Sequence, residues 1–208
     1  IFNVILEIRK GSILKDVYTK CLLPAYDIFD ETKYYTPGSS STIWKLGDAS
    51  FGLLICEDMW HSKQYDTNPL QMLMDEASGK KLNGVINFSA SPWNIDKEEK
   101  RLKRASEISQ VFQSPFYYVN KVGAEDEIIF DGASFVVNGS TVTNKAKSFK
   151  PDILTVDIQE AVELGDLGNA PDGAHSWESL FGPHIQLKGR DSCLRPLAPH
   201  KLDAIMGA

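Results

Sequence analysis

Three short apolar runs constrain the fold of this chain more than any other feature. Residues 51–55, 84–89 and 116–119 are dominated by branched and aromatic side chains. A run of this length and kind is typical of a strand that is buried on both faces. Hydrophobic residues make up 42% of the 208 residues and charged residues 24%, which is the composition of a folded globular chain rather than of a disordered one.

Helix signals lie between these runs. Asn68 precedes Pro69, as an N-cap precedes a proline at the first helical position, and the pattern continues to about residue 78. Asp96 precedes a strongly charged segment, which predicts an Asp-capped helix over residues 97–112. The order of elements from residue 51 to residue 120 is therefore β-α-β-α-β.

Hairpin signals flank this central unit, which favours an α+β fold over a purely parallel doubly wound sheet. Residues 4–8 and 12–18 read as two strands around a short turn, and Asn138-Gly139 is a strong hairpin signal. The remaining predictions are a loop at 20–38 and strands at 43–46, 133–137, 140–143 and 153–158. The apolar strand at 4–8 is expected to leave an unpaired edge that promotes self-association.

Charge and cysteine content exclude several classes of function. The chain has 22 Lys and Arg against 28 Asp and Glu, a net charge of −6, which argues against a nucleic-acid binder. The longest apolar stretch is far shorter than a membrane helix, and no signal peptide is visible, so a cytoplasmic location is expected. Cys21, Cys56 and Cys193 cannot all pair and have no zinc-ligand spacing, which favours a reducing compartment.

Cys56 is the strongest candidate for chemistry. It ends an apolar run and is followed by Glu57-Asp58, whereas a structural cysteine in a core seldom precedes two carboxylates. A sharp turn there would place the thiol at the sheet edge, where the next backbone N–H can face an oxyanion. His61 is a conceivable partner but is more typical of a surface histidine. Lys20 follows a strand beside apolar residues, and either donates to an oxyanion or extends its ammonium to solvent.

Five segments in a fixed order carry a resemblance to a known family. The first two contain Lys-x-x-Leu-Pro-x-Tyr, which begins at Lys20, and Gly-x-x-Ile-Cys-Glu-Asp-x-Trp, which includes Cys56. With the other three, they resemble the nitrilase (carbon–nitrogen hydrolase) superfamily, and within it the glutaminase domain of glutamine-dependent NAD synthetases. The segments are residues 20–38, 52–60, 87–93, 118–123 and 126–134.

The resemblance implies a glutaminase with Cys56 as the nucleophile. Lys20 and the backbone N–H of Glu57 would hold the oxyanion, and Glu31 matches a second acidic residue near the lysine. Four residues match positions that bind the amino and carboxylate groups of glutamine: Tyr26, Glu57, Ser91 and Lys97. For Lys97, a solvated helix face is an equally good explanation. Amide hydrolysis itself implies no metal or cofactor; ATP and Mg are expected only in a synthetase domain that is absent here.

The departures from the family pattern are as informative. The family's general base is a Glu well upstream of the catalytic lysine, but only Glu7 precedes Lys20 here, in unrelated surroundings. We therefore expect an incomplete α-β-β-α sandwich over residues 1–160, truncated at its N-terminus, and weak or absent glutaminase activity. Residues 161–208 are expected to form an irregular tail. They match no synthetase motif.

Three functions stay open at this point. The first is the glutaminase part of an NAD synthetase, with glutamine as substrate, an ATP-dependent synthetase domain as partner and homo-oligomers as the family's usual state. That part would supply ammonia for the amidation of nicotinic acid adenine dinucleotide. The second is another nitrilase-type amidohydrolase acting on a small amide or carbamoyl compound. The third is a catalytically inactive fragment that serves as an interaction module, which the missing base would favour.

Overall fold

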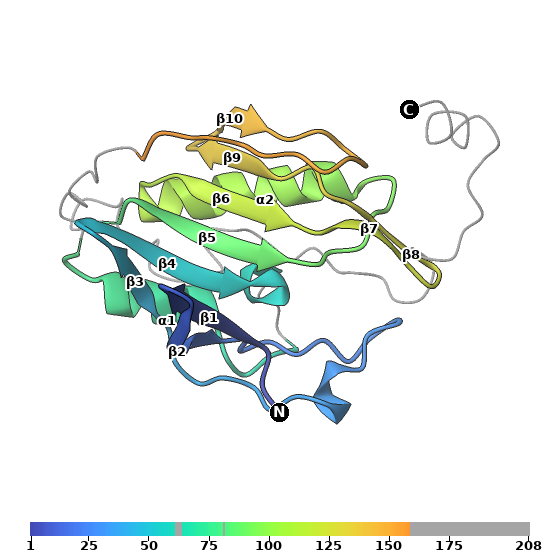
Figure 1. Ribbon diagram of the computed structural model, residues 1–208, viewed down its shortest axis with the longest axis horizontal. Helices are drawn as coiled ribbons and strands as arrows, with labels where there is room; N and C mark the ends of the chain where they lie inside the picture. Colours follow the sequence, from blue (N-terminus) through green and yellow to red (C-terminus); the bar gives the residue numbers. More distant parts are fainter. Residues whose placement is uncertain (61–63, 81, 159–208) are drawn as a thin grey trace, which may run out of the picture.

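The computed structural model describes residues 1–60, 64–80 and 82–158 (Figure 1). His61 and the tail predicted at 161–208 lie outside these residues, so the predicted domain boundary at residue 160 stays a prediction. Neither of the two described α-helices is long and apolar enough to cross a membrane.

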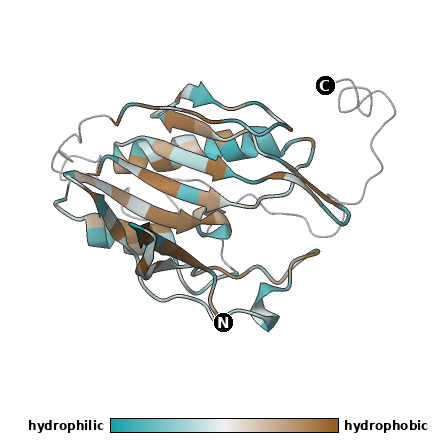
Figure 2. Cartoon of the chain, in the orientation of Figure 1, coloured by the Kyte–Doolittle hydropathy of each residue, from teal (hydrophilic) through white to brown (hydrophobic). Residues whose placement is uncertain are grey.

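A six-stranded mixed sheet forms the centre of the molecule, with strand order β10-β9-β6-β5-β4-β3. The three predicted apolar runs are its middle strands, and they pair in parallel. The outer pairings are antiparallel, which confirms a mixed α+β arrangement. The strands are β3 (Ile43–Leu46), β4 (Ala49–Ile55), β5 (Gly84–Ser89), β6 (Phe116–Asn120), β9 (Phe135–Asn138) and β10 (Thr141–Lys145). Figure 2 shows how hydrophobic the middle strands are.

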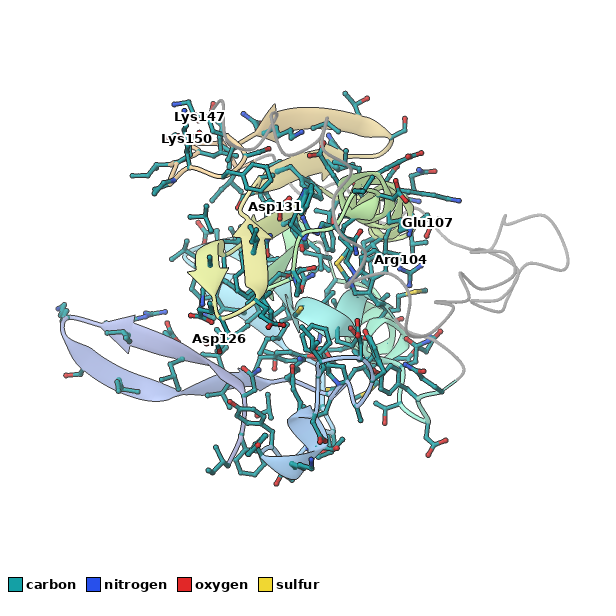
Figure 3. The ribbon with its side chains drawn as sticks, turned by 90° about the vertical axis from the view of Figure 1, so that its right-hand side faces the viewer. Arg104, Glu107, Asp126, Asp131, Lys147 and Lys150 are labelled. Carbon is teal, nitrogen blue, oxygen red and sulfur yellow. The ribbon has the colours of Figure 1, made fainter. Side chains whose placement is uncertain are left out.

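A separate two-stranded hairpin lies on one face of this sheet. It consists of β1 (Val4–Arg9) and β2 (Ser12–Thr19), as the sequence predicts. Lys10 and Gly11 turn the chain with φ angles of 49° and 77°, a left-handed conformation that suits glycine. Figure 3 shows the hairpin projecting on the side away from the helices. Its inner residues pack with β4 side chains in a small apolar cluster of Tyr18, Cys21, Leu53 and Ile55.

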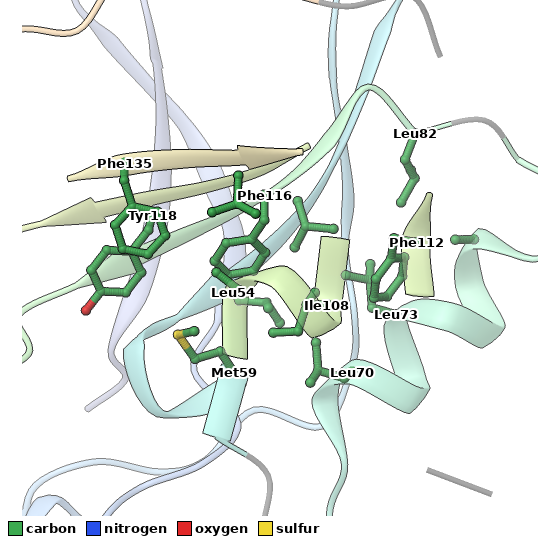
Figure 4. Close-up of a cluster of buried hydrophobic side chains, with 14 residues drawn as sticks. Leu54, Met59, Leu70, Leu73, Leu82, Ile108, Phe112, Phe116, Tyr118 and Phe135 are labelled. Atoms are coloured by element: carbon green, nitrogen blue, oxygen red, sulfur yellow. The ribbon is translucent and has the colours of Figure 1, made fainter. Parts of the chain in front are cut away.

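Two helices cover the opposite face, α1 (Pro69–Ala77) and α2 (Lys97–Phe112). The Asn68 side chain caps α1 by accepting from the Gln71 N–H, as predicted. Asp96 occupies the N-cap position of α2, as predicted, but its side chain makes no capping hydrogen bond. Apolar residues of both helices meet the sheet in the main core (Figure 4), which includes Leu54, Met59, Leu70, Leu73, Ile108, Phe112, Phe116, Tyr118 and Phe135.

Two further elements differ from the prediction. An additional hairpin, β7 (Val122–Glu125) with β8 (Ile128–Asp131), extends from the end of β6. The strand predicted at 153–158 is wrong: these residues form no ladder, and the Ile153 side chain is 89% exposed. Apolar residues alone do not make a strand, because a strand needs both a pairing edge and a face to bury. The loop at 20–38 is confirmed, apart from the short 3-10 helix η1 (Glu31–Lys33).

Candidate active site

The carboxyl ends of β4 and β5 border a cavity of about 380 Å³. The hairpin strand β1 closes one side of it, and the loop after β2 closes another. Its polar lining includes Lys20, Glu31, Cys56 and Glu57, which come from separate segments of the chain. All four were singled out from the sequence.

Cys56 lies where β4 ends and the chain turns into the 3-10 helix η2 (Cys56–Trp60). Its φ angle is +46°, a left-handed conformation that is uncommon for any residue with a side chain. The sharp turn expected from the sequence is therefore present. Burial raises the pKa of the Cys56 thiol above its usual value, and the Lys20 charge and a hydrogen bond from the Ala90 backbone offset only part of this rise.

Lys20 is buried, with 2% of its surface exposed, so it is not a surface lysine. Its Nζ donates to both carboxylate oxygens of Glu31, at 2.6 and 2.7 Å. Two charge-assisted hydrogen bonds of this kind compensate for the burial of the ammonium group. The ion pair therefore fixes one positive charge in the wall of the cavity that also contains the Cys56 thiol.

The Glu57 side chain is held by two tyrosines. The Tyr26 hydroxyl lies 2.9 Å from each carboxylate oxygen, and the Tyr65 hydroxyl donates to Oε1 at 3.1 Å. Burial raises the pKa of Glu57, and the hydrogen bonds from both tyrosines and the Lys20 charge counter that rise. Tyr26 was predicted, but Tyr65 was not, because no motif includes it.

Ser91 and Lys97 lie beyond the cavity lining. The Ser91 side chain is buried and accepts a hydrogen bond from the Arg101 guanidinium at 3.2 Å. The Lys97 ammonium lies 5.1 Å from the centre of the Trp60 ring, and its charge lowers the pKa of the Cys56 thiol. The structure thus places both near the site without placing either in the cavity wall.

A buried ion pair supports the segment that contains Ser91. Arg101 Nη1 donates to both carboxylate oxygens of Asp131 at 2.8 Å, and Nη2 donates to the Ser91 carbonyl at 2.8 Å and the Pro92 carbonyl at 3.0 Å. The Asn120 side chain accepts from the Ser91 N–H at 3.0 Å. Figure 3 shows Asp131 within the molecule. Sequence reasoning missed this network, because Arg101 lies in a helix whose many charges read as a solvated face.

Searches against known proteins find relatives of one kind. A glutamine-dependent NAD(+) synthetase of Synechocystis is 34% identical over 192 residues, or 86% of this chain and 34% of that protein. A synthetase of the same name from Thermotoga maritima is 35% identical over 76% of this chain and 26% of its own length. The chain thus spans about a third or less of these relatives. No family model matches.

Solved structures agree with these relatives. The glutamine-dependent NAD+ synthetase of Acinetobacter baumannii superposes with a TM-score of 0.63 and 28% identity, over 77% of this chain and 32% of that one. A carbon–nitrogen hydrolase from Helicobacter pylori superposes with a TM-score of 0.52 and 25% identity, over 66% of this chain and 49% of that one. The resemblance drawn from the sequence is confirmed: the chain is homologous to glutamine-dependent NAD+ synthetases and shares its fold with the carbon–nitrogen hydrolases of the nitrilase superfamily.

Proposed function

We propose that this chain is the glutamine-hydrolysing part of a glutamine-dependent NAD synthetase. One observation supports the proposal above all: Lys20, Glu31, Cys56 and Glu57 line one cavity at the carboxyl edge of the sheet. The relatives supply the chemical context, because the same region resembles both NAD synthetases and a carbon–nitrogen hydrolase. The part of a synthetase that it resembles is therefore the amide-cleaving part.

The reaction begins when the Cys56 sulfur attacks the side-chain amide carbon of glutamine. The Lys20 ammonium and the Glu57 backbone N–H stabilise the oxyanion that forms. The carbon–nitrogen bond then breaks, the nitrogen takes up the proton that the thiol lost, and ammonia leaves a thioester on Cys56. Water adds to the thioester, glutamate is released, and a proton returns to the sulfur.

Glu57 suits recognition of the amino group of glutamine. Its buried carboxylate has a raised pKa, so a substrate ammonium beside it would relieve the cost of burying a negative charge. Tyr26 and Tyr65 fix the orientation of the carboxylate. Lys97 and Ser91 are proposed to hold the substrate carboxylate, from positions just outside the present cavity wall.

The wider assignment follows the same proposal. The ammonia would pass to an ATP- and Mg-dependent synthetase domain that amidates nicotinic acid adenine dinucleotide in the cytoplasm. The complete fold would be an α-β-β-α sandwich that associates into homo-oligomers. Both carboxylate oxygens of Glu31 are engaged by Lys20, so we expect these 208 residues alone to release glutamate slowly.

A glutamine-like electrophile tests the proposal. The diazoketone 6-diazo-5-oxo-L-norleucine is added to the chain, and the modified cysteines are identified by peptide mass spectrometry. Cys21 serves as an internal control, because its side chain is buried and lies outside the cavity lining. We expect Cys56 to react first, with protection by glutamine, and the Cys56→Ala variant to lose the reaction. Equal reaction at both cysteines, or protection by acetamide but not by glutamine, would contradict it.

A further inference from the structure

Asp58 is a fully buried carboxylate to which the proposed reaction gives no role. A buried ionised group is costly unless it is hydrogen-bonded, so its partners indicate what it does. Four donors meet it. Its Oδ1 accepts from the backbone N–H of Cys21 at 3.1 Å and of Leu22 at 2.8 Å. Its Oδ2 accepts from the Ile55 N–H at 3.0 Å and the Tyr18 hydroxyl at 2.9 Å.

These donors come from two separate segments. Cys21 and Leu22 directly follow Lys20, and Ile55 directly precedes Cys56. One carboxylate thus connects the backbone beside the proposed oxyanion donor to the backbone beside the proposed nucleophile. It also holds the end of β4 at the point where Cys56 takes its left-handed φ angle.

Among the described residues, no sheet ladder makes this connection. Strand β2 pairs there with β1, and β4 pairs with β3 and β5, so the two segments belong to different sheets. The apolar cluster between them, around Leu53 and Ile55, is not directional and does not fix distances between polar atoms. Directional contacts from Asp58 therefore have a specific task here, beyond filling space.

We propose that Asp58 is a positioning residue that sets the distance between the Lys20 ammonium and the Cys56 thiol, and through it the reactivity of that thiol. This inference rests on the proposed function of Cys56. The charged groups that act on the thiol are Lys20 and Lys97, which favour the thiolate, and Glu57, which opposes it. Of these, Lys20 lies in the segment that Asp58 holds, so losing Asp58 weakens the favourable charge.

The test is the rate at which iodoacetamide alkylates Cys56 between pH 6 and 10, followed by peptide mass spectrometry. The variant is Asp58→Asn, which keeps the shape but turns one oxygen into an amide that faces donors. Phe112→Leu is the control. It disturbs the main core on the helix-covered face, and Figure 4 shows Phe112 at the far end of that core from Met59, which lies in the same turn as Cys56.

We expect Asp58→Asn to raise the pKa of the Cys56 thiol by about one unit and to slow its alkylation about tenfold at pH 7. The reason is that the variant no longer holds the Lys20 ammonium near the thiol, and a nearby cation lowers a thiol pKa by about that much. Phe112→Leu should leave both unchanged. Tyr18→Phe removes one donor and keeps the carboxylate, so it should slow alkylation about threefold, and it serves if Asp58→Asn fails to fold.

An unchanged pH profile in folded Asp58→Asn, or in Tyr18→Phe if Asp58→Asn does not fold, would overturn the positioning role while leaving the proposed function intact. An equally large loss of alkylation rate in Phe112→Leu would show that general destabilisation of the fold is the cause. A wild-type Cys56 whose alkylation is not slowed by glutamine would instead overturn the proposed function itself, and the positioning role with it.

Discussion

The helix-covered face of the central sheet and its carboxyl edge are held by different forces. On the helix-covered face, side chains from α1, α2 and the sheet form one apolar core. At the carboxyl edge, buried charges and their donors make the contacts, as in the pairs Lys20–Glu31 and Arg101–Asp131. Apolar packing tolerates exchange among side chains of similar size, whereas a buried charge depends on its own partner. The two regions should therefore differ in how well they tolerate substitution.

Of the substitutions considered, the replacement of Arg101 should lower the free energy of unfolding most. Arg101→Met leaves the Asp131 carboxylate buried without its main partner, and we expect unfolding to become easier by about 3–5 kcal/mol. A conservative core change, Ile108→Val, should cost about 1 kcal/mol. Denaturant unfolding measures both. Adding Asp131→Asn to Arg101→Met removes the unpaired charge and should recover much of the loss; a double variant as unstable as the single one would show that packing, not charge, is responsible.

The pH dependence of stability sharpens the same contrast. Burial raises the pKa of Asp58 from 3.8 to about 6, although hydrogen bonds from Leu22, Ile55 and Tyr18 oppose the rise. The folded chain then binds a proton between about pH 4 and 6 that the unfolded chain does not. The contribution of Asp58 to the free energy of unfolding therefore falls as pH rises through this window, by up to about 3 kcal/mol.

Chemical unfolding of the wild type and of Asp58→Asn at pH 4 and pH 7 measures this contribution as a difference. The wild type should lose stability relative to the variant between the two pH values. A constant difference would mean that Asp58 has the same pKa in both states.

The outer hairpin should show a smaller effect, on association. Leu6 and Ile8 of β1 are 42% and 63% exposed, and within the described residues no strand pairs with the outer edge of β1. We expect the chain to self-associate, and Ile8→Lys to reduce this by adding a charge to the edge. Light scattering after size-exclusion chromatography measures the mass. A wild-type monomer of about 23 kDa would contradict the expectation.

Sequence patterns predicted the helix-covered face better than the polar region. The apolar runs and the Asn68 cap depend on local periodicity and on neighbouring residues, which a sequence displays directly. Arg101, Tyr65 and the partners of Asp58 were missed, because most of their contacts join residues 8 to 40 positions apart. Motif resemblance found Cys56 and Lys20, yet it could not show which charges are buried.

The strand wrongly predicted at 153–158 shows the opposite error. Its apolar residues fit the pattern of a strand, but no neighbouring edge pairs with them and Ile153 faces solvent. The hairpin β7–β8 was missed for a related reason, since its strands have only four residues each. Short strands are defined by their partners more than by their own sequence.

The central claim is that the buried Lys20 charge activates the Cys56 thiol. Its most direct test is the pKa of that thiol, measured from the pH dependence of Cys56 alkylation in the wild type and in Lys20→Met. Methionine keeps much of the side-chain volume and removes the charge. We expect the pKa to rise by one unit or more in the variant, because a nearby cation favours the thiolate. An identical thiol pKa in the two folded proteins would contradict the account.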